Sequence, residues 1–147
     1  MTINEKQDEL IEEFEFLNDW MDKYEHIIEE AKELKPMPNE LKQEKYIIKG
    51  CQSRVWLFPE FKDGLLYFQA DSDAIISKGL VGLIVRVLSG FSPAEIKDAE
   101  LYFIDKIGLK EHLSPTRSNG LVAMVKQIKL YALALSQTMP NKIKAPN

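Results

Sequence analysis

A long apolar run in the middle of the chain, from Ala74 to Leu88, constrains the fold more than any other feature. Its apolar side chains follow the helical spacing but also occupy most of the circumference of the helix. Such a helix has to be surrounded by the rest of the chain. Gly79 and Gly82 lie on one side of it, and each costs about 1 kcal/mol relative to alanine in a helix. We therefore expect that side to pack closely against another element.

The N-terminal region, from about Thr2 to Leu34, has the pattern of amphipathic helices. Its apolar residues recur every three or four positions, and glutamates and lysines fill the positions between them. Asn18-Asp19 in the middle has the side chains of a helix cap, so the region is predicted to form two helices. Pro36 and Pro38 end it, because proline cannot continue a helix.

The next part of the chain has the character of a β-sheet. Short β-branched and aromatic runs at Tyr46–Lys49, Arg54–Phe58 and Leu65–Gln69 predict three strands. Lys62-Asp63-Gly64 is a turn signal, because glycine adopts positive φ at little cost. Short connections favour an antiparallel meander, with Pro59 on a sheet edge or at a strand end.

The C-terminal half is predicted to be helical. Asp71-Ser72-Asp73 supplies candidate caps for the apolar helix, and Ser92-Pro93 and Ser114-Pro115 are typical of helix starts. A short helical piece is expected over Phe103–Leu109, and the tail after Pro140 is expected to fray. The predicted fold class is α+β, with a three-stranded antiparallel sheet packed with helices in a single domain of residues 1–147.

Composition excludes several classes of function. The chain has 147 residues, 45% of them hydrophobic, and a net charge of −4, which argues against nucleic acid as the main partner. One cysteine and two histidines, His26 and His112, make neither a disulfide, a convincing zinc site nor a resident iron–sulfur cluster. The N-terminus lacks a signal-peptide pattern, and the longest apolar stretch is too short for a bilayer. We expect a cytoplasmic protein without a membrane segment.

The only cysteine, Cys51, is the main candidate for chemistry. It lies between two predicted strands, and therefore at a loop tip where a thiol can meet a partner. Gly50 permits unusual backbone angles, and Lys49 and Arg54 are cations that favour a reactive thiolate. A lone cysteine is, however, more often a small buried hydrophobe. The residues around Cys51 alone leave both readings open.

Other residues give weaker signals. His112 is a candidate base, but no pattern places it beside Cys51, and His26 is expected on a helix surface. Asp71 and Asp73 resemble a pair of carboxylates, although helix capping is the simpler explanation for both. Arg117 near a predicted helix start is unexpected, because the helix dipole disfavours a cation there.

Three linked motifs resemble the SufE family of sulfur acceptors, which includes CsdE, over nearly the whole chain. They are Gly50-Cys51-Gln52-Ser53-Arg54-Val55-Trp56; Asp71-Ser72-Asp73-Ala74 followed by Lys78-Gly79-Leu80; and Leu113-Ser114-Pro115-Thr116-Arg117-Ser118-Asn119-Gly120-Leu121 followed by Met124. Arg54 departs from the family, where glutamine is common, and this difference affects the expected electrostatics of partner binding.

The resemblance implies a function in iron–sulfur cluster assembly. Cys51 matches the cysteine that accepts persulfide sulfur from a PLP-dependent cysteine desulfurase of the SufS or CsdA type, which the acceptor also stimulates. Sulfur then passes to a scaffold complex. The acceptor is a sulfur carrier and not an enzyme, and it holds no cofactor or metal. The implied fold is like that of the IscU scaffold, which uses three cysteines, and a weak homodimer is plausible for the family.

The resemblance also suggests how the thiol works. Val55 and Trp56 are expected to shelter a persulfide on Cys51, and Gly50 is the hinge expected to let the loop swing out. The remaining site residues, Gln52, Ser53, Asp73 and Arg117, are expected to support the loop or to contact the partner. Two alternatives stay open. One is a thiol enzyme that uses Cys51 with a neighbouring base, and the other is an allosteric desulfurase activator without covalent transfer.

Overall fold

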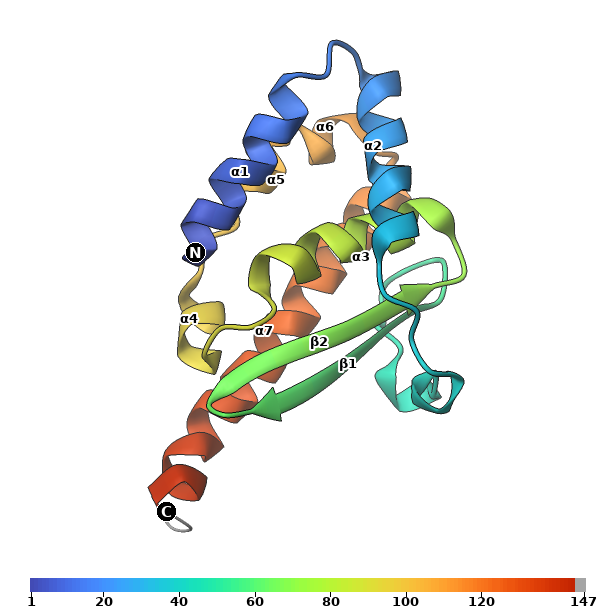
Figure 1. Cartoon of the computed structure of the whole chain (residues 1–147). Helices are drawn as coiled ribbons and strands as arrows, with labels where there is room; N and C mark the ends of the chain where they lie inside the picture. The colour runs from blue at the N-terminus through green and yellow to red at the C-terminus, as the bar shows by residue number, and fades with distance from the viewer. Residues whose placement is uncertain (145–147) are drawn as a thin grey trace.

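A computed structural model describes the backbone of residues 1–144 and the side chains of residues 1–136, and it has α+β architecture (Figure 1). The helices are α1 (Ile3–Glu15), α2 (Trp20–Glu33), α3 (Ile75–Leu88), α4 (Pro93–Asp98), α5 (Phe103–Ile107), α6 (Leu109–His112) and α7 (Pro115–Lys144). The two strands are β1 (Val55–Lys62) and β2 (Leu65–Ser72), and two 3₁₀ turns, η1 (Asn39–Leu41) and η2 (Glu44–Tyr46), precede them.

Helix α3 lies at the centre of the molecule, as its composition predicts. It packs against α1, α2, α7 and the hairpin of β1 and β2. Gly79 faces α2 so closely that a Cβ atom there would lie 2.2 Å from the carbonyl oxygen of Ile27. At Gly82 the nearest atom to such a Cβ would be Cγ of Glu30, at 3.5 Å. The expected close packing is therefore confirmed, and it is tight at Gly79 alone.

Polar contacts fix α1 and α2 on α3. Arg86 of α3 donates hydrogen bonds to Glu13 of α1 and, at 2.9 Å, to Glu30 of α2. Asp19 caps α2 by accepting a hydrogen bond from the Asp22 amide at 2.9 Å, which confirms the predicted break between two helices. The predicted cap at Ser92 is also present and forms a capping box with Glu95.

The sheet has two strands in the described structure, so the prediction of a third strand at Tyr46–Lys49 is wrong. The paired strands β1 and β2 are antiparallel, with Val55 opposite Ser72 and Lys62 opposite Leu65. Before β1, Ile47 makes only an isolated bridge to Trp56. The chain turns sharply at Gly50, where φ is +99°, so the pairing cannot extend into a strand.

The predicted hairpin turn and the edge position of its proline are confirmed. Asp63 and Gly64 both have positive φ, as a two-residue turn of type I′ requires. Pro59 lies within β1 opposite Phe68 and not at its end. Since β1 has only β2 as a neighbouring strand among the described residues, Pro59 stands on a sheet edge.

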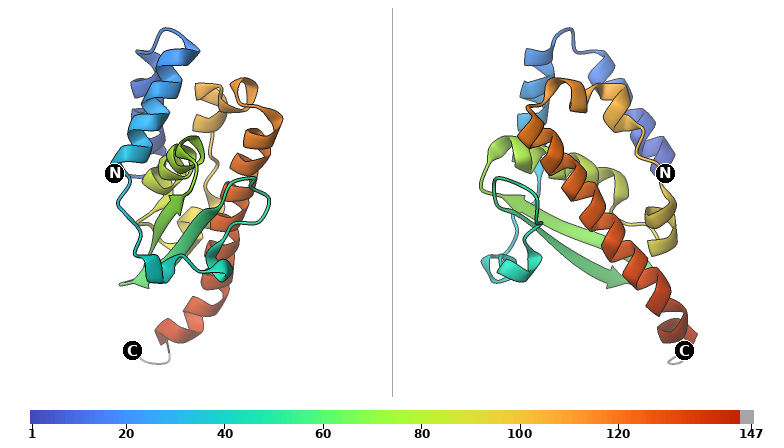
Figure 2. Two further views of the ribbon diagram at one scale, coloured as in Figure 1. Left: turned by 90° about the vertical axis from the view of Figure 1, so that its right-hand side faces the viewer. Right: turned by 180° about the vertical axis from the view of Figure 1, so that it is seen from behind.

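The predicted cap of the apolar helix is wrong. Asp71 and Ser72 are the last residues of β2, and the N-cap of α3 is Ala74, which has no side chain to accept a hydrogen bond. The acidic residues here have other partners, described below. At the other end of the chain, α7 crosses one face of the hairpin and continues past Pro140 to Lys144 (Figure 2). The remainder of the tail that was expected to fray, residues 145–147, lies outside the described residues.

The two glycines of α3 give a matched test of its packing. Gly79→Ala is expected to lower the free energy of unfolding by about 1–3 kcal/mol, because the new methyl group meets backbone atoms of α2 that cannot move easily. Gly82→Ala has room for its methyl group and is expected to be neutral or to stabilise by up to about 1 kcal/mol through helix propensity. Urea unfolding of both variants measures the difference, and equal effects would contradict the packing argument.

Candidate functional site

The loop between η2 and β1 carries Cys51 and is anchored at both ends. On one side, Ile48 is buried and its amide donates a hydrogen bond of 2.8 Å to the Val55 carbonyl. At the turn, a Cβ on Gly50 would lie 3.1 Å from Cβ of Ala123 in α7. The positive φ of Gly50 and this close approach both favour glycine. The loop is thus held against α7, while the hinge function predicted for Gly50 stays a prediction.

Cys51 is half-buried, and its thiol is held against α7. The Sγ atom donates a hydrogen bond to the Gly120 carbonyl, with a sulfur–oxygen distance of 3.6 Å. Burial raises the pKa of the Cys51 thiol. The expectation that Lys49 and Arg54 would favour the thiolate is therefore wrong for this arrangement of the loop. In this arrangement of the loop, burial favours the neutral thiol over the thiolate.

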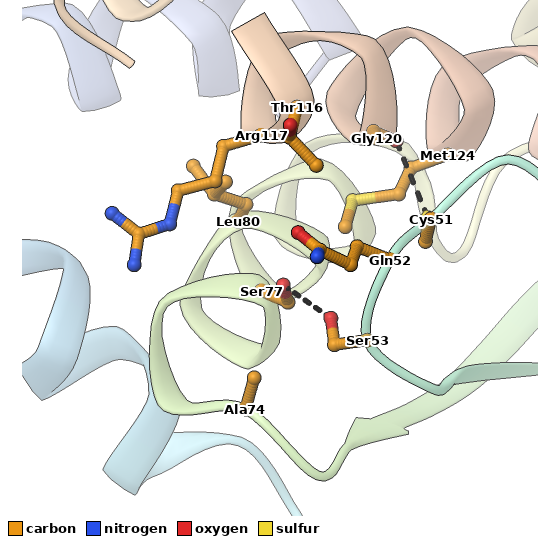
Figure 3. A pocket seen from close by; sticks show the side chains of 10 residues that line it. All are labelled: Cys51, Gln52, Ser53, Ala74, Ser77, Leu80, Thr116, Arg117, Gly120 and Met124. Carbon is orange, nitrogen blue, oxygen red and sulfur yellow. Dashed lines mark hydrogen bonds between the residues drawn. The ribbon is translucent and has the colours of Figure 1, made fainter. Parts of the chain in front are cut away.

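A pocket of about 230 Å³ opens beside Cys51 (Figure 3). Three segments meet around it: the thiol loop, the start of α3 and the start of α7. Helix starts favour negative charge, so this meeting point suits an anionic sulfur species. The residues lining the pocket are Cys51, Gln52, Ser53, Ala74, Ser77, Leu80, Thr116, Arg117, Gly120 and Met124.

The structure changes which residues shelter the thiol. Val55 is fully buried in the core, and Trp56 lies beneath the ammonium group of Lys42, so neither lines the pocket as expected. Leu80 and Met124 supply the apolar wall instead. Strand alternation explains the difference, because β1 begins at Val55 and directs that side chain into the core.

Two of the predicted loop residues reach the pocket. The side chain of Gln52 points into it (Figure 3). The hydroxyl of Ser53 shares a hydrogen bond of 2.7 Å with the hydroxyl of Ser77 in the first turn of α3. This bond is a direct side-chain link between the thiol loop and α3.

Asp73 holds the end of the loop, and Asp71 has a separate role. A carboxylate oxygen of Asp73 accepts a hydrogen bond of 3.0 Å from the Arg54 amide, and the Asp73 amide donates one of 3.2 Å to the Arg54 carbonyl. Asp71 pairs with Lys42 at 3.1 Å and Lys78 at 3.4 Å. Burial alone would raise the pKa of the Asp71 carboxyl, but the Lys42 and Ser72 hydrogen bonds and the two lysine charges outweigh it and lower that pKa.

Arg117 lies in the first turn of α7, at the end of the pocket away from Cys51 (Figure 3). Its guanidinium donates a hydrogen bond of 2.8 Å to the Tyr24 hydroxyl and lies 5.9 Å from the centre of the Tyr24 ring. Tyr24 belongs to α2, and the sequence pattern there predicted only that it lies on the apolar face of a helix. Sequence reasoning therefore missed Tyr24, and it also missed Ser77 as a pocket residue.

Neither histidine contacts the thiol. His112 stacks on Trp20, with 4.3 Å between ring centres, and its Nδ1 lies 2.9 Å from the Gly108 carbonyl oxygen. His26 lies 3.0 Å from a Glu13 carboxylate oxygen and packs edge-on against Phe14. Both imidazoles are thus engaged by residues away from the thiol loop.

Two further features, a metal-binding cluster and a membrane-spanning helix, are absent from the described residues. No group of three or more His, Cys, Asp and Glu side chains in that part of the chain is placed to hold a metal ion. No helix within the same residues is long and apolar enough to cross a membrane.

The fold and the site define a class of protein: an α+β protein whose single thiol lies on a loop beside a small pocket. Comparison with known proteins identifies the family. Residues 8–132 match the model of the SufE family, described as the Fe-S metabolism associated domain. The chain belongs to the SufE family, and with it to the sulfur acceptors of Fe–S metabolism.

Individual relatives agree with the family assignment. A SufE-like protein of Rhizobium meliloti is 40% identical, with 83% of this chain and 91% of the relative covered. A SufE-like protein of Synechocystis is 35% identical, with 85% and 79% covered. The solution structure of a hypothetical protein from Thermus thermophilus has the same fold, with a TM-score of 0.74, 22% identity and coverage of 90% of this chain and 96% of that one.

The burial of Cys51 predicts its reactivity as a function of pH. Because burial raises the thiol pKa, alkylation of the folded protein by iodoacetamide should reach half of its maximal rate at a higher pH than alkylation of the same protein unfolded in urea. Stopped-time alkylation followed by intact mass measures both profiles. Coincident profiles, or a folded profile shifted to lower pH, would contradict a thiol kept neutral by burial.

The Ser53–Ser77 bond predicts how firmly the loop is held. Ser77→Ala removes the bond and is expected to speed alkylation of Cys51 about two- to tenfold, the effect of losing one neutral hydrogen bond. Ser136→Ala is a matched control, because it removes a hydroxyl that donates a hydrogen bond to the Leu133 carbonyl within α7. The same acceleration in both variants would show that the bond does not restrain the loop.

Proposed function

We propose that Cys51 accepts persulfide sulfur from a PLP-dependent cysteine desulfurase of the SufS or CsdA type and passes it to an iron–sulfur scaffold complex. The observation that supports this most directly is the placement of Cys51, the only cysteine, beside the pocket on a loop that turns at Gly50 with positive φ. Family membership supports the same role. In this proposal the protein also stimulates the desulfurase and acts in the cytoplasm.

The transfer is an exchange between sulfur atoms. Cys51 loses its proton, and its thiolate attacks the outer sulfur of the donor persulfide. A bond forms between Sγ of Cys51 and that sulfur while the donor S–S bond breaks. The donor leaves as a thiolate and takes up a proton, so no external oxidant or reductant is needed. The carbon–sulfur cleavage that made the persulfide belongs to the desulfurase.

Two states of the loop serve this chemistry. In the closed state the thiol is half-buried and neutral, and Leu80 and Met124 keep a bound persulfide away from solvent. In the open state, rotation about Gly50 exposes the sulfur to the partner and removes the burial that raises the pKa. Opening breaks the contacts of Cys51 with Gly120 and of Ser53 with Ser77.

A carrier fits the site better than a thiol enzyme that uses a histidine base. Both imidazoles are engaged elsewhere, His112 by Trp20 and Gly108 and His26 by Glu13. The thiol bonds to a backbone carbonyl, and the other polar groups of the pocket include hydroxyls and the Gln52 amide, which do not accept a proton readily.

Incubation with the cognate desulfurase and free cysteine tests the proposal. Intact mass is expected to show a gain of about 32 Da, one sulfur atom, on the wild-type protein and none on Cys51→Ser. Alanine production by the desulfurase, measured in parallel, is expected to rise with the wild type. An unchanged mass, with Cys51→Ser still stimulating alanine production, would instead support an allosteric activator without covalent transfer.

A further inference from the structure

The pocket beside Cys51 carries a positive charge that no side chain described through residue 136 neutralises. Arg117 is exposed, and its polar side-chain contact is with the neutral Tyr24 hydroxyl. Among side chains through residue 136, no carboxylate lies within ion-pairing distance of it. Only one of the five N–H donors of the guanidinium is needed for Tyr24. The rest can form the planar fork that binds a carboxylate with two hydrogen bonds.

The size and walls of the pocket fit a molecule about as large as an amino acid. Its volume of about 230 Å³ is below the ~300–1,000 Å³ typical of sites for drug-sized ligands. The hydroxyls of Ser53, Ser77 and Thr116 can hydrogen-bond polar groups, while Leu80 and Met124 suit sulfur and carbon atoms. The thiol and the guanidinium stand at opposite ends, so a ligand can present different groups to each (Figure 3).

We propose that this pocket binds a free α-amino-acid persulfide, with the ligand carboxylate on Arg117 and its outer sulfur directed to Cys51, and that Cys51 takes the sulfur from it without a desulfurase. The inference rests on the proposed function, because Cys51 must be able to accept sulfane sulfur. It adds a second class of sulfur donor, a small molecule that the pocket recognises by its carboxylate.

The transfer involves only Cys51 and the amino-acid persulfide, and it needs no external oxidant or reductant. The Cys51 thiolate attacks the outer sulfur of the amino-acid persulfide, and a new S–S bond forms at Cys51. The S–S bond of the donor breaks, and its electron pair leaves on the amino-acid thiolate. That thiolate takes up the proton that Cys51 released. The products are the Cys51 persulfide and the free amino-acid thiol.

Tyr24 is a positioning residue in this proposal. It contacts Arg117 through its hydroxyl and its ring, and it is itself packed against Trp20, with 5.8 Å between ring centres. A guanidinium held by a neutral partner keeps its charge available for a ligand, whereas an acidic partner would neutralise it. Tyr24→Phe removes the hydroxyl and keeps the ring, so it changes the orientation of the Arg117 guanidinium with little change in packing.

The test uses the full chain alone with cysteine persulfide, followed by intact mass over time. The wild type is expected to gain one sulfur with a rate that saturates with persulfide concentration. Arg117→Gln is expected to raise the half-saturating concentration about tenfold or more, since a charge-assisted contact is lost, with little change in the maximal rate. The half-saturating concentration of Tyr24→Phe is expected to lie between those of the wild type and Arg117→Gln.

A matched ligand separates recognition of the carboxylate from general effects on the thiol. The persulfide of cysteine ethyl ester lacks the negative charge, so it should react weakly with the wild type and equally with Arg117→Gln. A structural role for Arg117 would lower both reactions together. Urea unfolding verifies that the variants are folded. If Arg117→Gln does not fold, the reactions of the acid and the ester with Tyr24→Phe test whether the carboxylate is recognised.

Several outcomes would overturn the inference. The first is that the acid and the ester react equally with the wild type. The second is that the rate of Arg117→Gln depends on persulfide concentration as the wild-type rate does, and the third is that the wild-type rate does not saturate. No sulfur gain from cysteine persulfide, with normal gain from the desulfurase, would overturn the inference alone. No gain from either donor would overturn the proposed function as well.

Discussion

The close approach of α2 and α3 at Gly79 is the constraint on which the rest of the structure depends. An apolar helix such as α3 gains stability only if its neighbours leave no gap around it, and the missing side chain at Gly79 lets the backbone of α2 reach the helix surface. Arg86 strengthens the same junction from the last turn of α3, where it binds acidic residues of both α1 and α2. Together these contacts determine where α3 points, and therefore where its first turn lies.

The first turn of α3 is half of the candidate site. Ser77 and Leu80 enter the pocket from α3, and Arg117 and Gly120 enter it from α7. The tip of the thiol loop lies over this junction, where Cys51 bonds to Gly120 and Ser53 to Ser77 through neutral hydrogen bonds that are each worth only about 1 kcal/mol. In the proposed function, bonds this weak let a partner surface offset the cost of opening the loop.

Prediction from sequence worked where local patterns decide the structure. The capped amphipathic helices, the Asp63-Gly64 turn and the buried apolar helix are all present, because caps, turns and helical periodicity act within a few residues. It failed at Tyr46–Lys49, where β-branched residues form a loop, and at Asp71 and Asp73, which bind distant groups instead of capping α3. In those places long-range contacts outweigh local preference.

The sequence by itself determined the family, the α+β class and the identity of the single reactive candidate, because motif order and a lone Cys51 are properties of the chain alone. Only the tertiary structure decided the state of that thiol and its surroundings. Desolvation depends on what packs around a group, and burial of Cys51 in this fold raises the pKa of its thiol, which the neighbouring residues in the chain did not predict. The contact between Tyr24 and Arg117 likewise joins residues far apart in the sequence, and it exists only because α2 and α7 meet beside the pocket.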